Sequence, residues 1–212
     1  MEVFECIRTR RSVRKYKEQP VEWDKVVNIL EAGKLAPSAG NLQNFKFIVV
    51  KDEETRKKIS EAALNQTWMV KAPVHIIVCS EPEKTKRFYG VRGERLYTIQ
   101  DCAAAIENML LTAHSLGLGA CWVGAYEEDM IRRLMNLPEQ AITHAIITIG
   151  YADEKPVMQP HHRIEHLVFL EKWGQRKKIP LSSSGWWSVR VKKAVDDTKK
   201  SISKVGQKLT TK

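Results

Sequence analysis

The sequence predicts an α+β fold with about five strands between helices, built around one core. The first observation is that segments with apolar residues at helical spacing are interspersed with short apolar runs of strand length. The second is their order, which is neither a strict alternation of strand and helix nor compatible with a barrel of eight units. The third is composition, because 43% hydrophobic and 28% charged residues in a chain of 212 are typical of a globular protein.

Five helices are expected, because in each of them apolar residues recur on one helical face. Their ranges are 2–9, 24–33, 52–64, 97–116 and 127–135. The helix 97–116 is the longest and is apolar nearly all round, which is typical of a helix that is central or that forms half of a subunit interface. The segment 81–94 is charged and is expected to face mostly solvent, although Phe88 and Tyr89 could line a cleft.

Five strands are expected from short runs of β-branched and other apolar residues. Their ranges are 45–50, 74–79, 120–124, 141–149 and 166–170. The run 74–79 is almost continuously apolar, which predicts a strand that is buried on both faces.

The charge is distributed unevenly and indicates two parts, a body at 1–173 and a tail at 174–212. The whole chain carries a formal net charge of +10, but the tail alone has eleven Lys and Arg against two Asp. The body is therefore nearly neutral, at +1, and the basic balance is no evidence that the body binds nucleic acid.

The tail contains one apolar stripe on an otherwise basic segment, the pattern of an amphipathic helix. The stripe consists of Trp187, Val191, Val195, Thr198, Ile202, Val205 and Leu209. Three interpretations stay open: a helix packed on its own dimer, contact with a membrane surface through Trp186 and Trp187, and, least favoured, nucleic-acid binding.

A cytoplasmic protein with reduced thiols is expected. The sequence has no apolar run of the roughly 18 residues that span a bilayer, and Met1 to Glu5 is acidic where a signal peptide would be basic and then apolar. Cys6, Cys79, Cys102 and Cys121 are far apart in apolar surroundings and form no Cys-x-x-Cys pair. This pattern suits core thiols better than disulfides or zinc ligands.

Three familiar classes of site are not supported by the motifs. The glycines of Gly117-Leu118-Gly119 follow a helix and precede a strand, so they are interpreted as a helix end and not as a dinucleotide fingerprint. His161, His162 and His166 have no cysteine or carboxylate at ligand spacing, so no metal site is expected. No nucleophile with a histidine and an acid at hand is recognisable either.

The segment Arg10-Arg11-Ser12-Val13-Arg14 is typical of an anion site. Guanidinium groups match phosphate or carboxylate oxygens two at a time, and an extended chain would place Arg10, Ser12 and Arg14 on one side. Taken alone, such a run is more often solvated surface. A second candidate is the loop 35–44, which is rich in turn formers and small polar residues and leads directly into a strand.

Five pieces taken in order carry a resemblance to a known family. They are Arg10 to Arg14, the loop Pro37-Ser38-Ala39-Gly40-Asn41-Leu42-Gln43-Asn44, Asn65-Gln66 ahead of Ala72-Pro73, the segment 117–125 with Trp122-Val123-Gly124-Ala125, and a final Arg163. With these pieces the chain resembles the nitroreductase family of FMN-dependent oxidoreductases over about residues 4–173.

The resemblance implies an intertwined homodimer with a mostly antiparallel central sheet and FMN at the subunit interface. The residues implied to bind FMN are Arg10, Arg11, Ser12, Arg14, His161 and Arg163 at the phosphate, Pro37, Ser38, Ala39 and Asn41 from the partner subunit's side, Asn65 and Gln66 at the ring edge, and Val123 and Gly124 near N5. The chain departs from the family pattern at Gln43-Asn44-Phe45, where many members have Gln-Pro-Trp. It departs again at His161-His162-Arg163, where a Lys-x-Arg pair is frequent, so phosphate affinity would vary with pH.

The implied activity is transfer of a hydride from NAD(P)H to FMN and then to a nitroaromatic, quinone or similar small acceptor in a ping-pong cycle. No protein acid or base is expected, because flavin carries the redox chemistry. The alternatives are a flavin-binding or membrane-recruited protein without turnover, and a relative with dehalogenase or flavin-degrading chemistry.

Overall fold

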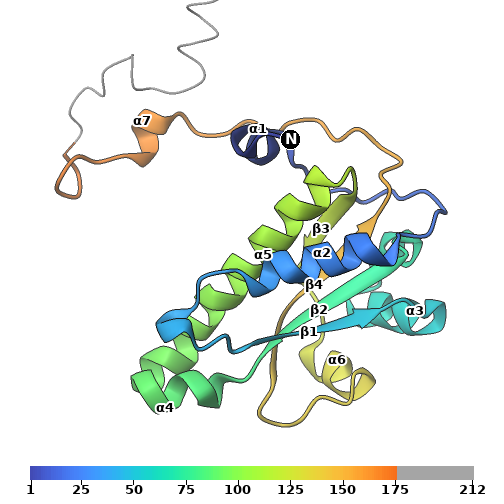
Figure 1. Ribbon diagram of the computed structural model, residues 1–212, viewed down its shortest axis with the longest axis horizontal. Helices are drawn as coiled ribbons and strands as arrows, with labels where there is room; N and C mark the ends of the chain where they lie inside the picture. The colour runs from blue at the N-terminus through green and yellow to red at the C-terminus, as the bar shows by residue number, and fades with distance from the viewer. Residues whose placement is uncertain (176–212) are drawn as a thin grey trace, which may run out of the picture. The chain divides into compact units, whose positions relative to one another are not determined.

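The computed structural model describes residues 1–175 and divides the chain into two units, Met1–Met158 and a second that begins at Gln159. The first unit contains a four-stranded, fully antiparallel sheet of strand order β1-β2-β4-β3 (Figure 1). The strands are β1 (Phe45–Val50), β2 (Val74–Ser80), β3 (Gly119–Val123) and β4 (Ile142–Gly150). The α+β class and these four strands are confirmed, whereas the expected number of about five is too high for the described residues.

Strand β2 lies at the centre of the sheet and every one of its residues is buried, as expected from its continuous apolar run. It pairs with β1 from Phe45↔Ser80 to Val50↔His75 and with β4 on its other side. The pairing with β4 shifts register between Val78 and Cys79.

Two helical layers cover the two faces of the sheet. Alternate residues of β2 belong to different cores, because successive side chains of a strand point to opposite faces. Ile76 packs with α2 (Trp23–Lys34) and α5 (Thr98–Ser115), while Ile77 packs with α3 (Glu53–Ala62) and α6 (Glu128–Leu134). The expected helices at these positions are therefore confirmed.

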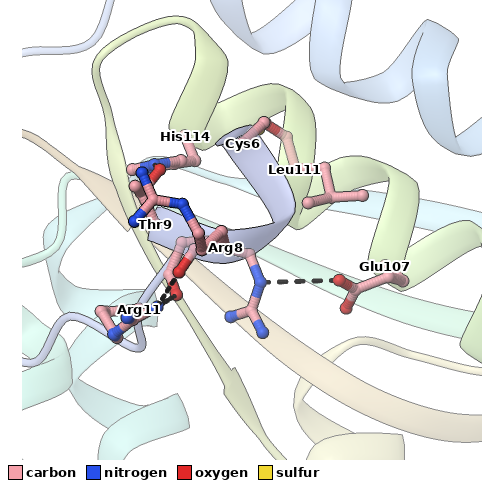
Figure 2. A network of polar contacts seen from close by, with 8 residues as sticks. Cys6, Arg8, Thr9, Arg11, Glu107, Leu111 and His114 are labelled. Carbon is pink, nitrogen blue, oxygen red and sulfur yellow. Dashed lines mark hydrogen bonds and ion pairs between the residues drawn. The ribbon is translucent and has the colours of Figure 1, made fainter. Parts of the chain in front are cut away.

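Helix α5 is central on its face of the sheet, as its apolar composition predicts. It buries Cys102, Ile106 and Met109 completely. Its outer side carries α1 (Val3–Thr9), which touches the C-terminal half of α5 (Figures 1 and 2). Ile99, in the first turn of α5, is 52% exposed.

The segment before α5 is more structured than its charge suggested. It forms α4 (Pro82–Arg92), a break at Gly90 with φ 59°, and a π-helical turn Gly93–Tyr97 that continues into α5. A Cβ atom on Gly93 would lie 2.5 Å from the carbonyl oxygen of Thr85, so only glycine fits where these turns meet.

The second unit contains a short helix, α7 (Ile164–Leu167), and no strand within 159–175. The predicted strand 166–170 is therefore wrong. Local interactions replace it: the amide of Leu170 donates to the carbonyl of Gln175 at 3.0 Å, Glu171 has φ 66°, and the Phe169 and Trp173 rings lie 4.7 Å apart. Because the chain turns back at Leu170, the apolar run has no extended stretch that could pair with another strand.

The tail's amphipathic stripe lies outside the described residues, and the boundary at 173/174 stays a prediction. In the part of the chain that the structure describes, no helix combines the length and the apolar character needed to cross a bilayer.

Candidate functional site

The arginine segment, Arg10 to Arg14, is held in extended form along β3. Helix α1 ends at Thr9, and the amide of Arg10, which follows it, donates to the carbonyl of Cys6 at 2.9 Å. Ser12 then forms a parallel bridge with Ala120, and the amide of Val13 donates to the Ala120 carbonyl at 3.0 Å. The extended conformation expected from the sequence is therefore confirmed by this pairing.

The side chains of Arg10 and Arg11 make different contacts, and Figure 2 shows Arg11 turned toward α1. The Nε atom of Arg10 is buried, has no hydrogen-bond partner, and lies 3.5 Å from Oε1 of Glu107 on α5. Arg11 turns back on α1, where its Nη1 donates to the carbonyl oxygens of Arg8 and Arg10 at 2.8 and 2.5 Å. Arg10 thus retains unused donor capacity, while part of the Arg11 guanidinium is spent on the backbone.

Arg14 projects toward Trp68, with its Cζ atom 6.0 Å from the indole centroid. Trp68 also stacks on Tyr16 at a centroid separation of 6.5 Å. The carboxylate of Glu154 accepts from the backbone amides of Arg14 and Lys15 at 2.5 and 3.0 Å, which fixes the chain beneath the side chain. A guanidinium held over an indole is pre-positioned for an anion or a planar ring.

An open cavity of about 570 Å³ lies beside Arg14 and Trp68. Its lining residues are Arg14, Lys15, Tyr16, Lys17, Glu18, Trp68, Lys71 and Asp153. Lys71 forms an ion pair with Glu18 and lowers the pKa of that carboxyl. Four cationic and two acidic side chains leave the cavity with a positive balance, which favours an anionic ligand.

Ser12 lies beside the thiol of Cys121 on β3. Burial raises the pKa of Cys121, and this effect outweighs the nearby arginines and the hydrogen bond with Ser12. A thiol with a raised pKa stays protonated at neutral pH and is a poor nucleophile. All four cysteines are free and buried, as predicted for core thiols.

Asn65 and Gln66 are joined to the segment after β3. The backbones of Leu64 and Asn65 both have φ 56°, a left-handed conformation that turns the chain sharply after α3. The Nε2 atom of Gln66 donates to the carbonyl of Ala125 at 3.2 Å. Two of the predicted pieces, Asn65-Gln66 and Val123-Gly124, are therefore neighbours, and Trp68 connects them to the arginine segment through Tyr16 and Arg14.

The loop with Pro37, Ser38, Ala39 and Asn41 lies elsewhere in the molecule. The amide of Ala39 donates to Oδ1 of Asp101 at 2.9 Å, in the first turn of α5. The α1 end of the arginine segment meets α5 later, where Thr9 contacts His114 at 2.8 Å. At 1.5 Å per helical residue, Asp101 and His114 are roughly 20 Å apart. The described chain therefore does not bring this loop to the arginine segment.

His161 and Arg163 belong to the second unit. Both are exposed, and Nε of Arg163 lies 3.4 Å from the carboxylate of Glu165. Their assignment to a phosphate stays a prediction.

Three residues that the sequence interpretation did not assign are important in the geometry: Trp68, Asp101 and Glu154. Trp68 could have been found, because it follows Asn65-Gln66 closely and aromatic residues often line ligand sites. Asp101 and Glu154 gave no such signal, since acidic residues in a helix and a loop are ordinary.

The donor set of the arginine segment fits a phosphate group. Three guanidinium groups and one hydroxyl lie within the five residues from Arg10 to Arg14, and the buried Nε of Arg10 lacks a hydrogen-bond partner. The described residues contain no group of three His, Cys, Asp or Glu side chains that could hold a metal ion.

Comparison with known proteins agrees with these features. The chain matches the family model described as the nitroreductase family over residues 7–69 and 62–151. A protein of Archaeoglobus fulgidus with the provisional name NADH dehydrogenase/NAD(P)H nitroreductase is 39% identical over 178 residues, covering 81% of this chain and 99% of that protein. The FMN reductase [NAD(P)H] of Bacillus subtilis is 29% identical over 177 residues, covering 75% and 69%.

The fold has close counterparts among solved structures. An FMN-dependent nitroreductase from Clostridium difficile superposes with a TM-score of 0.65 at 31% identity, covering 74% of this chain and 91% of that one. The chain is thus similar to these proteins along most of its length. The matched part includes the antiparallel sheet and the arginine segment that pairs with β3. The chain belongs to the nitroreductase family.

Proposed function

We propose that the protein is an FMN-dependent oxidoreductase that works as a homodimer and uses NAD(P)H to reduce a nitroaromatic, a quinone or a similar small acceptor in a ping-pong cycle. The observation that carries the proposal is the junction of the arginine segment, Trp68, Asn65-Gln66 and Val123-Gly124 on one side of β3. Relatives named as an NAD(P)H nitroreductase and an FMN reductase support the same chemistry.

In this proposal Arg10, Ser12 and Arg14 hold the phosphate of FMN. The guanidinium groups supply charge-assisted donors, and the extended backbone on β3 keeps their spacing fixed. Arg11, His161 and Arg163 were assigned to the same phosphate from sequence. Arg11 contributes least among the cluster, because its Nη1 is bonded to backbone carbonyls.

In this proposal Asn65 and Gln66 would contact the edge of the flavin ring, and the backbone of Val123 and Gly124 would lie near the N5 side of the ring. A side chain would be easily accommodated at Gly124, where the nearest heavy atom to an added Cβ is Nε1 of Trp122 at 3.8 Å. Space above this backbone leaves room for a planar ring to approach it. When bound, FMN supplies the hydride and electron chemistry, so the chain's own task is to bind, orient and shield the reactants.

The homodimer follows from the position of the second loop. Pro37, Ser38, Ala39 and Asn41 are attached to the first turn of α5, far from the arginine segment of the same protomer. A second copy would supply them to the first copy's flavin. Apolar side chains that such an interface would cover include Phe4 and Ile7 on α1 and Ile99 on α5, which are 56%, 52% and 52% exposed.

The proposal is tested on the purified full chain under anaerobic conditions. We expect a flavin absorption spectrum that is bleached by NADH or NADPH and restored by a quinone or a nitroaromatic, with parallel lines in double-reciprocal initial-rate plots. A bound flavin that neither nucleotide reduces would instead support the binding-protein alternative. Product analysis with a halogenated aromatic and with FMN alone distinguishes dehalogenation and flavin breakdown from acceptor reduction.

A further inference from the structure

We propose that Asp101 is a positioning residue that holds the loop Pro37–Asn41 in its flavin-binding shape. The inference rests on the proposed function, because it assigns a role within the same site. Asp101 is only 5% exposed, and its Oδ1 accepts the amide hydrogen of Ala39 at 2.9 Å. It reaches the loop from α5, although Asp101 and Ala39 are 62 residues apart in the chain.

The loop has a shape that needs support from outside. Gly40, Asn41 and Gln43 have φ of 55°, 55° and 50°, and left-handed backbone is unfavourable for the two side-chain-bearing residues. The loop's internal bonds run from the amides of Asn41 and Gln43 to the carbonyl and hydroxyl oxygens of Ser38, at 2.9 and 3.0 Å. These bonds define a local turn but do not attach it to the fold.

The first turn of α5 makes that attachment at both ends of the loop. Asp101 accepts a hydrogen bond from the Ala39 amide. Thr98, three residues earlier on the same helix face, accepts one from Nδ2 of Asn44 at 3.1 Å. Asn44 is completely buried and also donates to Thr85 of α4 at 2.5 Å. Two polar contacts with α5, one at Ala39 and one at Asn44, therefore attach the loop to the fold.

The burial and incomplete hydrogen bonding of the Asp101 carboxyl indicate a role in function and not in stability. Its Oδ2 atom is buried and has no hydrogen-bond partner in the described residues. Burial raises the pKa of the Asp101 carboxyl, and the Ala39 amide offsets that effect only in part. A buried, half-satisfied carboxyl destabilises a fold, so an apolar residue would serve this helix better if the loop did not need an acceptor here.

The test compares Asp101→Ala with Asp101→Asn, which keeps an acceptor oxygen at the same place, and with the control Asp129→Ala, an exposed carboxylate in the first turn of α6. Amide hydrogen exchange of residues 37–44 is measured without flavin, and FMN binding is measured by titration. We expect Asp101→Ala to speed exchange of the Ala39 amide at least tenfold and to weaken FMN binding at least tenfold. Asp101→Asn and Asp129→Ala should stay within threefold of the wild type.

The outcomes separate this proposal from the proposed function. A wild type that binds no flavin and oxidises no NAD(P)H overturns both. A wild type that does both, with an Asp101→Ala variant that matches it in exchange or in FMN affinity, overturns the role of Asp101 alone. If Asp101→Ala does not fold, Asp101→Ser replaces it, because serine fills part of the space but is too short to reach the Ala39 amide.

Discussion

A Cβ atom placed on Gly119 would lie 2.8 Å from Cγ1 of Val13 and 2.9 Å from its Cβ. The first residue of β3 therefore touches Val13 of the arginine segment, with no room for a side chain between them. This close approach lets the amide of Val13 reach the carbonyl of Ala120, and through it sets the position of Arg10, Ser12 and Arg14.

Gly119→Ala is therefore expected to push the arginine segment away from β3. Overpacking of a tight contact costs about 1–3 kcal/mol, so the free energy of unfolding in urea should fall by that amount and FMN affinity should fall with it. The double variant Gly119→Ala/Val13→Gly removes the Cβ as well as both Cγ atoms of residue 13 from the contact and should recover part of the affinity. A single variant that binds FMN as tightly as the wild type would show that the contact does not position the segment.

Arg14→Ala is expected to weaken binding of FMN much more than binding of riboflavin. Loss of a charge-assisted hydrogen bond costs about 1.5–3 kcal/mol, which corresponds to roughly a 10- to 150-fold rise in the Kd for FMN. Riboflavin has no phosphate and should be affected only through the contact of Arg14 with Trp68. Equal losses for the two ligands would contradict a phosphate role, and Arg133→Ala, an exposed arginine on α6, is the control.

Arg11→Ala is expected to change FMN affinity by less than about threefold, although Arg11 belongs to the same cluster. Its Nη1 is bonded to the carbonyls of Arg8 and Arg10, so this part of the guanidinium is not available to a phosphate. The measurement is the same FMN titration. A loss as large as that of Arg14→Ala would mean that Arg11 changes its contacts when the phosphate binds.

Complementation tests whether each site is shared between two subunits. Two variants are compared: Arg10→Ala/Arg14→Ala removes the phosphate contacts, and Ser38→Trp places a bulky side chain where the loop would meet the flavin. Each should bind little flavin as a homodimer. Co-expressed in equal amounts they should form heterodimers with one intact site, so about a quarter of the wild-type flavin content should return. No recovery, with heterodimers demonstrated by differently tagged chains, would place both elements in a site within one subunit.

Stability should depend on pH through His75, which is fully buried in β2 and bonded at Nε2 to the carbonyl of Met69 at 2.9 Å. Burial lowers the pKa of His75 from 6.5 to about 4. Its contribution is complete above the unfolded-state pKa and is lost as the pH falls from about 6.5 toward 4, because the unfolded chain then binds a proton that the folded chain refuses.

The size of the effect is about 3 kcal/mol at most. Urea unfolding at pH 7.5 and at pH 4.5 should therefore show a fall in stability that is smaller in His75→Gln, whose amide can still donate to Met69. An identical fall in the two proteins would assign the pH dependence to other groups.

Local pattern was sufficient for most elements of the fold. The apolar spacing predicted α2, α3, α5 and α6 and the four strands within a few residues, because one-sided burial leaves a period of 3.6 or 2 in the sequence. It failed at 166–170, where four apolar residues have the composition of a strand but the chain folds back through Leu170 and Gln175. It also missed α4, whose charged sequence has no clear apolar stripe.

The sequence by itself determined the segments, the residue types and the order from which the family could be inferred, including the extended arginine run and the loop 37–44. Only the tertiary structure decided what those residues face. Arg10 lies against Glu107, Arg14 over Trp68, and Ala39 on Asp101, at sequence separations of roughly 50 to 100 residues. No local period records such contacts, because they arise when helix α5 and the sheet bring distant segments together, and the energy of each depends on burial that only the folded chain creates.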